Sequence, residues 1–161
     1  METLPWLKGG IPWSPYWWRT IRDICNKHDI LMITDDVCTC WGKGGDYHGW
    51  KKYAVQPDIS ALGKSLTAGY TPLGCSVANK KVGEVLKKQD WEFGHTWQPT
   101  MTGISAMNAV NNIIVREKLF ELCKPIEDSL RFFAEDCLDR KYITGYRVSD
   151  LFLSLDVKEE L

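Results

Sequence analysis

The sequence predicts an α/β fold built on a mostly parallel sheet. Short apolar runs, typical of buried strands, alternate along the chain with stretches of helical periodicity. Turns that contain glycine and proline separate these segments, and there is no internal repeat or low-complexity linker. The chain has 161 residues, 44% hydrophobic and 25% charged, which suits one core of ordinary size in one domain or in part of a larger one.

The first predicted elements are a helix and a strand. Ser14 and Pro15 supply a cap residue followed by a proline at the first helical position, so the pattern predicts a helix over residues 16–28. The wholly apolar run at residues 30–34 predicts a buried parallel strand. Two aspartates and a glycine-rich loop follow it.

The remainder of the chain continues the alternation of strands and helices. Residues 69–74 are rich in turn-forming residues, which indicates a connection between two strands. Further strands are predicted at residues 57–62 and 75–78, helices at 82–88, 103–122 and 125–139, and a closing strand or hairpin at 146–157.

Composition argues against several classes of partner. The formal net charge of -1 gives no electrostatic reason to expect nucleic acid or an anionic membrane surface. No run approaches the roughly 20 apolar residues of a membrane span, and the first residues show no signal-peptide pattern. The six cysteines are scattered and form no CxxC pair, so we expect free thiols and a cytoplasmic location.

Eight tryptophans are many for a chain of this length, and five of them lie before residue 50. A large aromatic surface needs a partner to cover it, so this count suggests a missing domain or subunit.

Candidate chemistry lies where the first two predicted strands end. Asp35 and Asp36 follow one strand, and Lys64 follows the next. In open α/β sheets ligands bind beyond the carboxyl ends of the strands. A lysine that forms a Schiff base with an aldehyde, beside a carboxylate that keeps a pyridine nitrogen protonated, suits pyridoxal phosphate (PLP) chemistry. Thr96 offers a hydroxyl for a phosphate oxygen.

Two other sites can be drawn from the same region. Cys38, Cys40 and His48 resemble part of a zinc site, but no fourth ligand stands at a familiar spacing, so we expect no metal. Residues 62–65 resemble the end of a phosphate-binding P-loop. The full P-loop pattern requires glycine where this chain has Asp58, and the glycines and proline that follow are a poor start for the required helix.

The local sequence around these residues resembles class III PLP-dependent aminotransferases. The segments LMITDDV (31–37) and TCWGKGG (39–45) are similar to the block L-I-x-D-E-V-x-T-G-F-G-R-x-G of that family. PDISALGKSLTAGYTPLG (57–74) is similar to P-D-I-x-x-x-x-K-x-L-x-x-G-Y-x-P-L-G, and GHTWQ (94–98) to G-H-T-Y-x. The order and separations agree across about 70 residues, and weaker similarity covers nearly all the rest.

The resemblance implies a role for each matching residue. Lys64 matches the Schiff-base lysine, Asp35 the partner of the pyridine nitrogen and Val37 the residue packed on the ring face. Thr96 matches the threonine that reaches the phosphate from the neighbouring subunit, which implies a homodimer or a complementing chain. We expect an apolar pocket to lower the pKa of Lys64 and so favour its free amine.

The resemblance also implies the fold and the function. The chain would hold the central part of the fold-type-I large domain over residues 1–124 and the start of the small C-terminal domain over residues 125–161. It would transfer an amino group between an amine or amino acid and a keto acid or aldehyde.

The chain departs from the family pattern in ways that leave an alternative open. Family members are more than twice as long, and their N-terminal half supplies the phosphate loop. Val148 and Asp150 replace two glycines of an R-G-x-G-L turn, and Asp36, Cys40 and Lys43 replace glutamate, glycine and arginine. The alternative function is therefore a non-catalytic remnant, or one part of a split aminotransferase.

Overall fold

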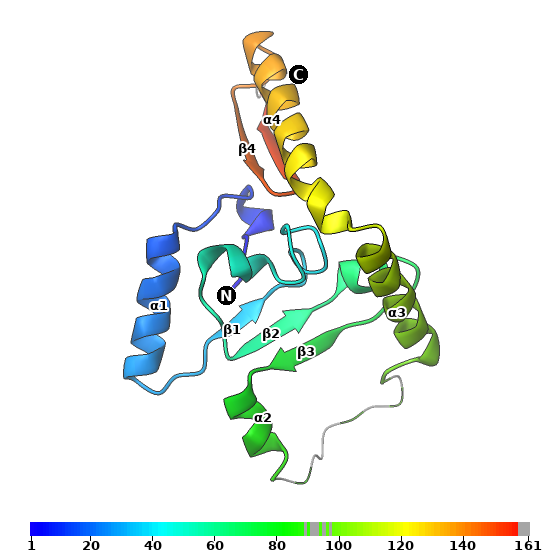
Figure 1. Cartoon of the computed structure of the whole chain (residues 1–161). Helices are drawn as coiled ribbons and strands as arrows, with labels where there is room; N and C mark the ends of the chain where they lie inside the picture. Colours follow the sequence, from blue (N-terminus) through cyan, green and yellow to red (C-terminus); the bar gives the residue numbers. More distant parts are fainter. Residues whose placement is uncertain (89, 91–93, 95, 97, 158–161) are drawn as a thin grey trace.

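A three-stranded sheet forms the centre of the computed structural model, which describes residues 1–88, 90, 94, 96 and 98–157. Strand β1 (Ile33–Asp35) pairs in parallel with β2 (Ile59–Leu62), and β2 pairs in antiparallel fashion with β3 (Cys75–Ala78) (Figure 1). Glu2 forms a further parallel bridge to Asp35 on the other side of β1. Two of these three pairings are parallel and one is antiparallel, which agrees with the predicted mostly parallel sheet.

Helix α1 (Pro15–Lys27) packs at one side of the sheet, close to its predicted position. The Ser14 hydroxyl accepts a hydrogen bond from the Trp17 amide at 3.1 Å, which satisfies one of the free donors at the helix start. Trp18 is fully buried and stacks on Tyr53 with 4.7 Å between ring centroids. This contact anchors the helix to the short 3-10 helix Gly49–Tyr53 beneath it.

Only one face of the sheet is covered by the described residues. Thr34 and Ser60 are buried, and their hydroxyls lie 2.9 Å apart. Ile33, on the opposite face of β1, is 51% exposed. The preceding residues Ile30 and Leu31 are exposed to a similar extent. The prediction of a wholly buried strand at residues 30–34 is therefore wrong for this face: the run is apolar, but no described element packs on it.

A second small core forms beside the carboxyl end of β2. Cys40, Leu62 and Leu66 are buried together, with Trp41 and Met107 packed against them. Met107 belongs to α3 (Met101–Arg116), which lies beside the 3-10 helix Lys64–Thr67. The helix predicted to continue to residue 122 ends earlier, because Lys118 adopts a left-handed conformation (φ 52°) before the 3-10 helix Leu119–Leu122. The short helix α2 (Lys80–Leu86) follows β3 directly.

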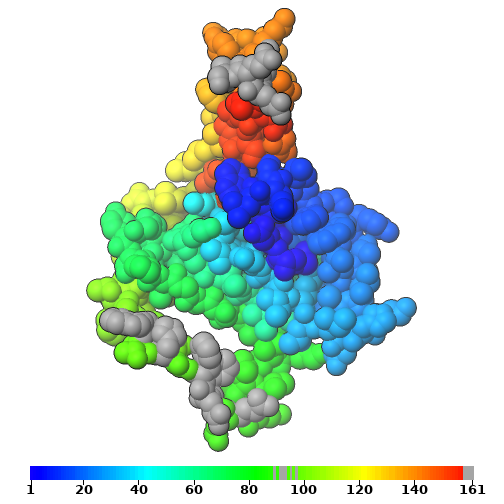
Figure 2. Space-filling model, turned by 180° about the vertical axis from the view of Figure 1, so that it is seen from behind, coloured from blue at the N-terminus to red at the C-terminus, as the bar shows by residue number. Residues whose placement is uncertain are grey.

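Helix α4 (Cys123–Asp139) and the hairpin of β4 (Gly145–Ser149) and β5 (Phe152–Asp156) project from the body of the molecule. Figure 2 shows this unit as a narrow extension above the wider sheet region. Arg147 links it to the N-terminal segment: the guanidinium forms a bidentate ion pair with Asp156 and donates to the Gly9 carbonyl at 2.7 Å. The hairpin turn forms although two family glycines are replaced, because Asp150 itself adopts the left-handed conformation (φ 54°).

The tryptophans that the structure describes do not form the large exposed aromatic surface that their number suggested. Trp18 is buried, while Trp13, Trp17 and Trp50 pack against the core beneath α1. Trp91 and Trp97 lie outside the described residues. Among the residues described, no helix is long and apolar enough to cross a membrane.

Candidate active site

The carboxyl ends of β1 and β2 bring Asp35 and Lys64 to one cavity. Asp35 is the last residue of β1 and lies opposite Ala61 of β2, three residues before Lys64. Lys64 begins a 3-10 helix and has a positive φ of 42°, an unusual backbone conformation for a lysine. Both residues line a cavity of about 130 Å³, which is the geometry predicted from the sequence.

The Lys64 ammonium group donates a 2.7 Å hydrogen bond to Cys38 Sγ. This hydrogen bond raises the pKa of Lys64 above its ordinary value, and the negative charge of Asp35 adds to the effect. The side chain is exposed rather than enclosed by apolar groups. The expectation of a lowered pKa is therefore wrong in this state, because the described residues leave Lys64 hydrated and next to an acceptor and a carboxylate.

Asp35 is held in place by its backbone on both sides. Its amide donates to the Met1 carbonyl at 2.7 Å, and its carbonyl accepts from the Thr3 amide at 3.2 Å. Its carboxylate Oδ1 accepts from the Val37 amide at 3.0 Å. Among the described residues none donates a hydrogen bond to Oδ2. This oxygen can therefore accept a hydrogen bond from a protonated ligand atom.

Val37 lines the same cavity as Asp35 and Lys64. Its position depends on Gly63, because a methyl group at that glycine would lie 3.3 Å from Val37 Cγ1. The branched side chain thus lies in the wall that it shares with the carboxylate and the lysine, where it can support one face of a flat ring.

Thr96 lies apart from this group. It is exposed, in a turn that precedes α3, and it lines none of the cavities that Lys64 lines. His95 and Trp97 of the same motif lie outside the described residues. The structure therefore brings together three of the four predicted site residues and leaves the fourth on the surface.

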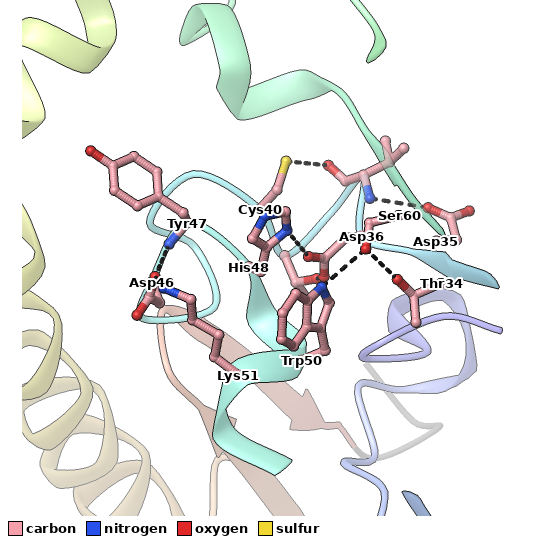
Figure 3. A network of polar contacts seen from close by, with 12 residues as sticks. Thr34, Asp35, Asp36, Cys40, Asp46, Tyr47, His48, Trp50, Lys51 and Ser60 are labelled. Carbon is pink, nitrogen blue, oxygen red and sulfur yellow. Dashed lines mark hydrogen bonds and ion pairs between the residues drawn. The ribbon is translucent and has the colours of Figure 1, made fainter. Parts of the chain in front are cut away.

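A polar network beneath the site was not predicted from the sequence. Asp36 is fully buried, accepts a short hydrogen bond from Thr39 and has its Oδ2 3.3 Å from His48 Nδ1 (Figure 3). Next to it Trp50 donates to Ser60 at 3.0 Å. The sequence held one indication of this network. Thr39 stands three residues after Asp36, a spacing at which the two side chains can form a hydrogen bond across a turn.

The three residues of the zinc arrangement that the sequence allowed have separate hydrogen-bond partners in the structure. His48 faces Asp36, while Cys38 accepts from Lys64. Burial raises the pKa of Cys40 to about 11, and its thiol lies 3.3 Å from the Gly63 carbonyl as a hydrogen-bond donor. Over the described parts of the chain, no group of three or more potential ligands is arranged to hold a metal.

Lys64 stands at the junction of three cavities. Besides the small one with Asp35, it lines a larger cavity of about 370 Å³ toward the β4–β5 hairpin and another of about 790 Å³ toward α3. The last contains the hydroxyls of Thr67, Tyr70, Thr71 and Thr100. The 3-10 helix after Lys64 is only four residues long, so the P-loop interpretation, which requires a long helix here, is wrong.

The residues that line the small cavity suit the ring of PLP better than its phosphate group. A lysine for the aldehyde, a carboxylate oxygen for the ring nitrogen and an aliphatic side chain for the ring face share one small cavity. That cavity contains no serine, threonine or arginine that could bind the phosphate.

A lysine and an aspartate placed in this way, on an α/β sheet, form an arrangement that suits the chemistry of PLP enzymes. Residues 2–161 match the model of the aminotransferase class-III family, and the chain belongs to that family.

Named relatives and solved structures agree with this assignment. The chain is 36% identical over 119 residues to the putrescine–pyruvate aminotransferase of Pseudomonas aeruginosa, covering 72% of this chain and 26% of that protein. It is 30% identical over 160 residues to the taurine–pyruvate aminotransferase of Bilophila wadsworthia, covering 94% of this chain and 35% of that protein.

Among solved structures, an (S)-enantioselective omega-transaminase from Thermomicrobium roseum superposes with a TM-score of 0.89 at 27% identity, over 98% of this chain and 36% of that one. The taurine:2-oxoglutarate aminotransferase from Bifidobacterium kashiwanohense, solved with PLP and glutamate, gives a TM-score of 0.84 at 28% identity, over 92% and 33% of the two chains. The chain spans 25–35% of the length of the curated relatives it first matches.

Proposed function

We propose that this chain carries the cofactor lysine of a PLP-dependent aminotransferase, with Lys64 as the catalytic residue. The observation that carries the proposal is that Asp35 and Lys64 share one cavity at the carboxyl ends of adjacent parallel strands. Membership of the class-III family supports the same assignment.

The proposed mechanism divides the work among three side chains. When bound, PLP supplies an aldehyde that takes up the amino group and a ring that accepts the electrons released at the substrate carbon. Lys64 would hold the cofactor and, with its amine free, would move a proton at the substrate carbon as general base. Asp35 Oδ2 would hold the proton on the ring nitrogen, and Val37 would support the ring face. The substrates are an amine or amino acid and a keto acid or aldehyde.

A second chain is part of the proposal. Thr96 is exposed and lies outside the cavities at Lys64, which is consistent with a phosphate contact made in the site of a neighbouring subunit. We also propose that the small C-terminal domain starts near residue 125, since α4 and the β4–β5 hairpin project together. Six unpaired cysteines favour a cytoplasmic location.

The alternative is a remnant, or one part of a split aminotransferase, that needs a further segment to work. Among the described residues, none that lines the small cavity offers a hydroxyl or guanidinium group for a phosphate, and this favours the alternative. Under this alternative the ring end of the site is present but cofactor affinity is weak.

The test is to capture the cofactor on its lysine. The protein is incubated with PLP, treated with borohydride and digested, and modified lysines are located by mass spectrometry. We expect modification concentrated on Lys64 and lost in Lys64→Ala, whereas Lys87→Ala, at an exposed lysine of the same chain, keeps it. Modification spread evenly over the exposed lysines would contradict the assignment.

Amino transfer and the split-enzyme alternative are separated in a second step. Adding an amino donor to the loaded protein should bleach the absorbance of the lysine-bound cofactor in one turnover. If Lys64 is labelled but bleaching requires an added N-terminal segment from a relative, the chain is one part of a split enzyme. If bleaching fails even then, the chain is a remnant.

A further inference from the structure

Cys38 and Lys64 form a pair of nucleophilic side chains, and the proposed mechanism makes no use of the thiol. The Lys64 ammonium group lies 2.7 Å from Cys38 Sγ, although the two residues are 26 positions apart in the sequence. A thiol and an amine share only a hydrogen bond, because both donate electron pairs. An oxidised sulfur is different, since it accepts attack by a neighbouring nitrogen nucleophile.

Backbone contacts fix both ends of this pair. The turn that carries the thiol closes where the Cys40 amide donates to the Asp36 carbonyl at 2.8 Å. Lys64 begins the 3-10 helix whose first turn closes where the Leu66 amide donates to the Gly63 carbonyl at 3.0 Å. Two fixed turns therefore bring the sulfur and the nitrogen together, and rotation within the flexible lysine stem can close the remaining distance.

A small oxidant can reach the sulfur. Cys38 is half-buried, and together with Lys64 it lines both the cavity of about 130 Å³ and the cavity of about 370 Å³. A positive charge beside a cysteine favours the anionic sulfur that attacks peroxides. Lys64 supplies this charge, and Lys43 adds a second one at the wall of the larger cavity. Access and charge therefore both favour oxidation at Cys38.

Three other cysteines lack this combination. Cys40 is buried, its thiol donates to the Gly63 carbonyl at 3.3 Å, and burial raises its pKa to about 11. Cys123 is also buried and donates to the Gly42 carbonyl at 3.6 Å. Cys75 is exposed, but burial of its thiol raises its pKa, and no ammonium group among the described residues donates to it. Cys75 can therefore serve as a control that separates exposure from charge.

We propose that Cys38 is an oxidation site and that its oxidised sulfur bonds covalently to Lys64, which withdraws the lysine from cofactor capture. The Cys38 sulfur attacks one oxygen of hydrogen peroxide and the O–O bond breaks. The products are a sulfenic acid and hydroxide, which takes up the thiol proton and becomes water. The free amine of Lys64 then attacks the sulfur. A sulfur–nitrogen bond forms, the S–O bond breaks, and the hydroxyl leaves as a second water with a proton from the amine.

A dithiol reductant reverses the bond. One thiol of dithiothreitol attacks the Cys38 sulfur and releases the Lys64 amine, and the second thiol then frees Cys38 as the reductant closes into its own disulfide. The oxidation state of one sulfur thus determines whether the lysine is available. This consequence rests on the proposed function, whereas formation of the sulfur–nitrogen bond does not.

The first test is peptide mass spectrometry after peroxide treatment in mildly alkaline buffer, which supplies the free amine. Free thiols are alkylated before tryptic digestion. We expect peptide 28–43 joined to peptide 53–80, with cleavage lost at Lys64 and a mass two hydrogen atoms below the sum of the separate peptides. A disulfide from Cys75 would join the same peptides with the same mass. The bond should therefore persist in Cys75→Ser and disappear in Lys64→Arg and Cys38→Ser.

Two lysine variants separate charge from nucleophilicity. Cys38 sulfenic acid is labelled with dimedone during peroxide treatment. Lys64→Arg keeps the positive charge, so labelling should continue at nearly the wild-type rate without any bond to residue 64. Lys64→Met removes the charge, so labelling of Cys38 should slow by about tenfold.

Three results would overturn the proposal. One is dimedone labelling of Cys38 in the wild type with no bond to Lys64 when dimedone is omitted. Another is a cross-link that survives in Lys64→Arg and is lost in Cys75→Ser, which would identify a disulfide. The third is equal labelling of Cys38 in the wild type and in Lys64→Met.

Cofactor capture then tests the consequence. PLP and borohydride should label Lys64 in the reduced protein, fail to do so after peroxide, and label it again after dithiothreitol. Cys38→Ala should be labelled equally before and after peroxide. Undiminished labelling of the peroxide-treated wild type refutes the withdrawal of the lysine. Absence of any label on Lys64 in the untreated protein refutes the proposed function instead, and the peptide masses then still decide whether the sulfur–nitrogen bond forms.

Discussion

Lys64 Nζ lies 2.7 Å from Cys38 Sγ, and this hydrogen bond is the main cause of the raised pKa of Lys64. A protonated amine does not attack an aldehyde, so the contact slows cofactor capture until the ammonium group loses its proton.

Removing the thiol should therefore accelerate capture. In Cys38→Ala the pKa of Lys64 falls, so at pH 8 a larger share of the amine is free and the rate of adduct formation with pyridoxal should rise. The measurement is the initial rate of absorbance change. Cys75→Ser, at a cysteine that does not contact Lys64, serves as control. A slower rate in Cys38→Ala would show that the thiol assists capture.

Asp35→Asn should separate cofactor capture from amino transfer. The amide keeps the shape of the side chain, so borohydride still traps the cofactor on Lys64. Bleaching by an amino donor should slow by roughly a hundredfold, on the order of losing one positioned proton-holding group. Asp46→Asn, at an exposed ion pair, should leave the rate unchanged. Equal rates in both variants would remove Asp35 from the mechanism.

Asp58 binds three groups that are distant from it in the sequence and should dominate stability near β2. Its carboxylate accepts from Arg22, from the Met32 amide and from Asn79, each at 2.7 Å. Asp58→Ala leaves these donors without an acceptor. It should lower the free energy of unfolding by about 2–4 kcal/mol, measured by urea denaturation. Lys81→Ala, which breaks an exposed ion pair, should change it by less than about 0.5 kcal/mol.

The Asp58 carboxylate should also make the protein less stable to unfolding at low pH. Burial alone would raise the pKa of Asp58, but the hydrogen bonds from Arg22, Met32 and Asn79 outweigh it and hold the pKa below its usual value. A lowered folded-state pKa gives stability that is complete above the unfolded value of about 3.9 and is lost as the pH falls through the lower folded value. Urea midpoints measured between pH 5 and pH 2 should drop in the wild type, with a smaller drop in Asp58→Asn.

Asp36 should matter for the shape of the site rather than for its chemistry. Asp36→Ala leaves the Thr39 hydroxyl and His48 without their buried partner, and we expect a loss of about 2–4 kcal/mol of unfolding free energy. Asp23→Ala, on the exposed side of α1, is the control and should be close to neutral. A neutral Asp36→Ala would show that water replaces the network.

The sequence predicted those parts of the fold that depend on local signals. The cap at Ser14, strand β3 and the hairpin β4–β5 lie at or within a few residues of their predicted positions, since cap residues, apolar runs and turns act over short distances. The positions of Asp35 and Lys64 followed from the strand ends. What could not be predicted depends on residues distant in the chain: the pKa of Lys64 depends on a thiol 26 residues away, and the exposure of Ile33 depends on which elements cover the sheet.

That uncovered face has a consequence for handling the protein. Ile33 of β1 presents an apolar surface, and on the other side of β2 all four residues of β3 are exposed at an edge of the three described strands. An open strand edge next to an apolar face is a template for pairing with another molecule. Concentrated samples should therefore self-associate through β3, and light scattering should rise with protein concentration and fall when Val77→Lys places a charge on that edge.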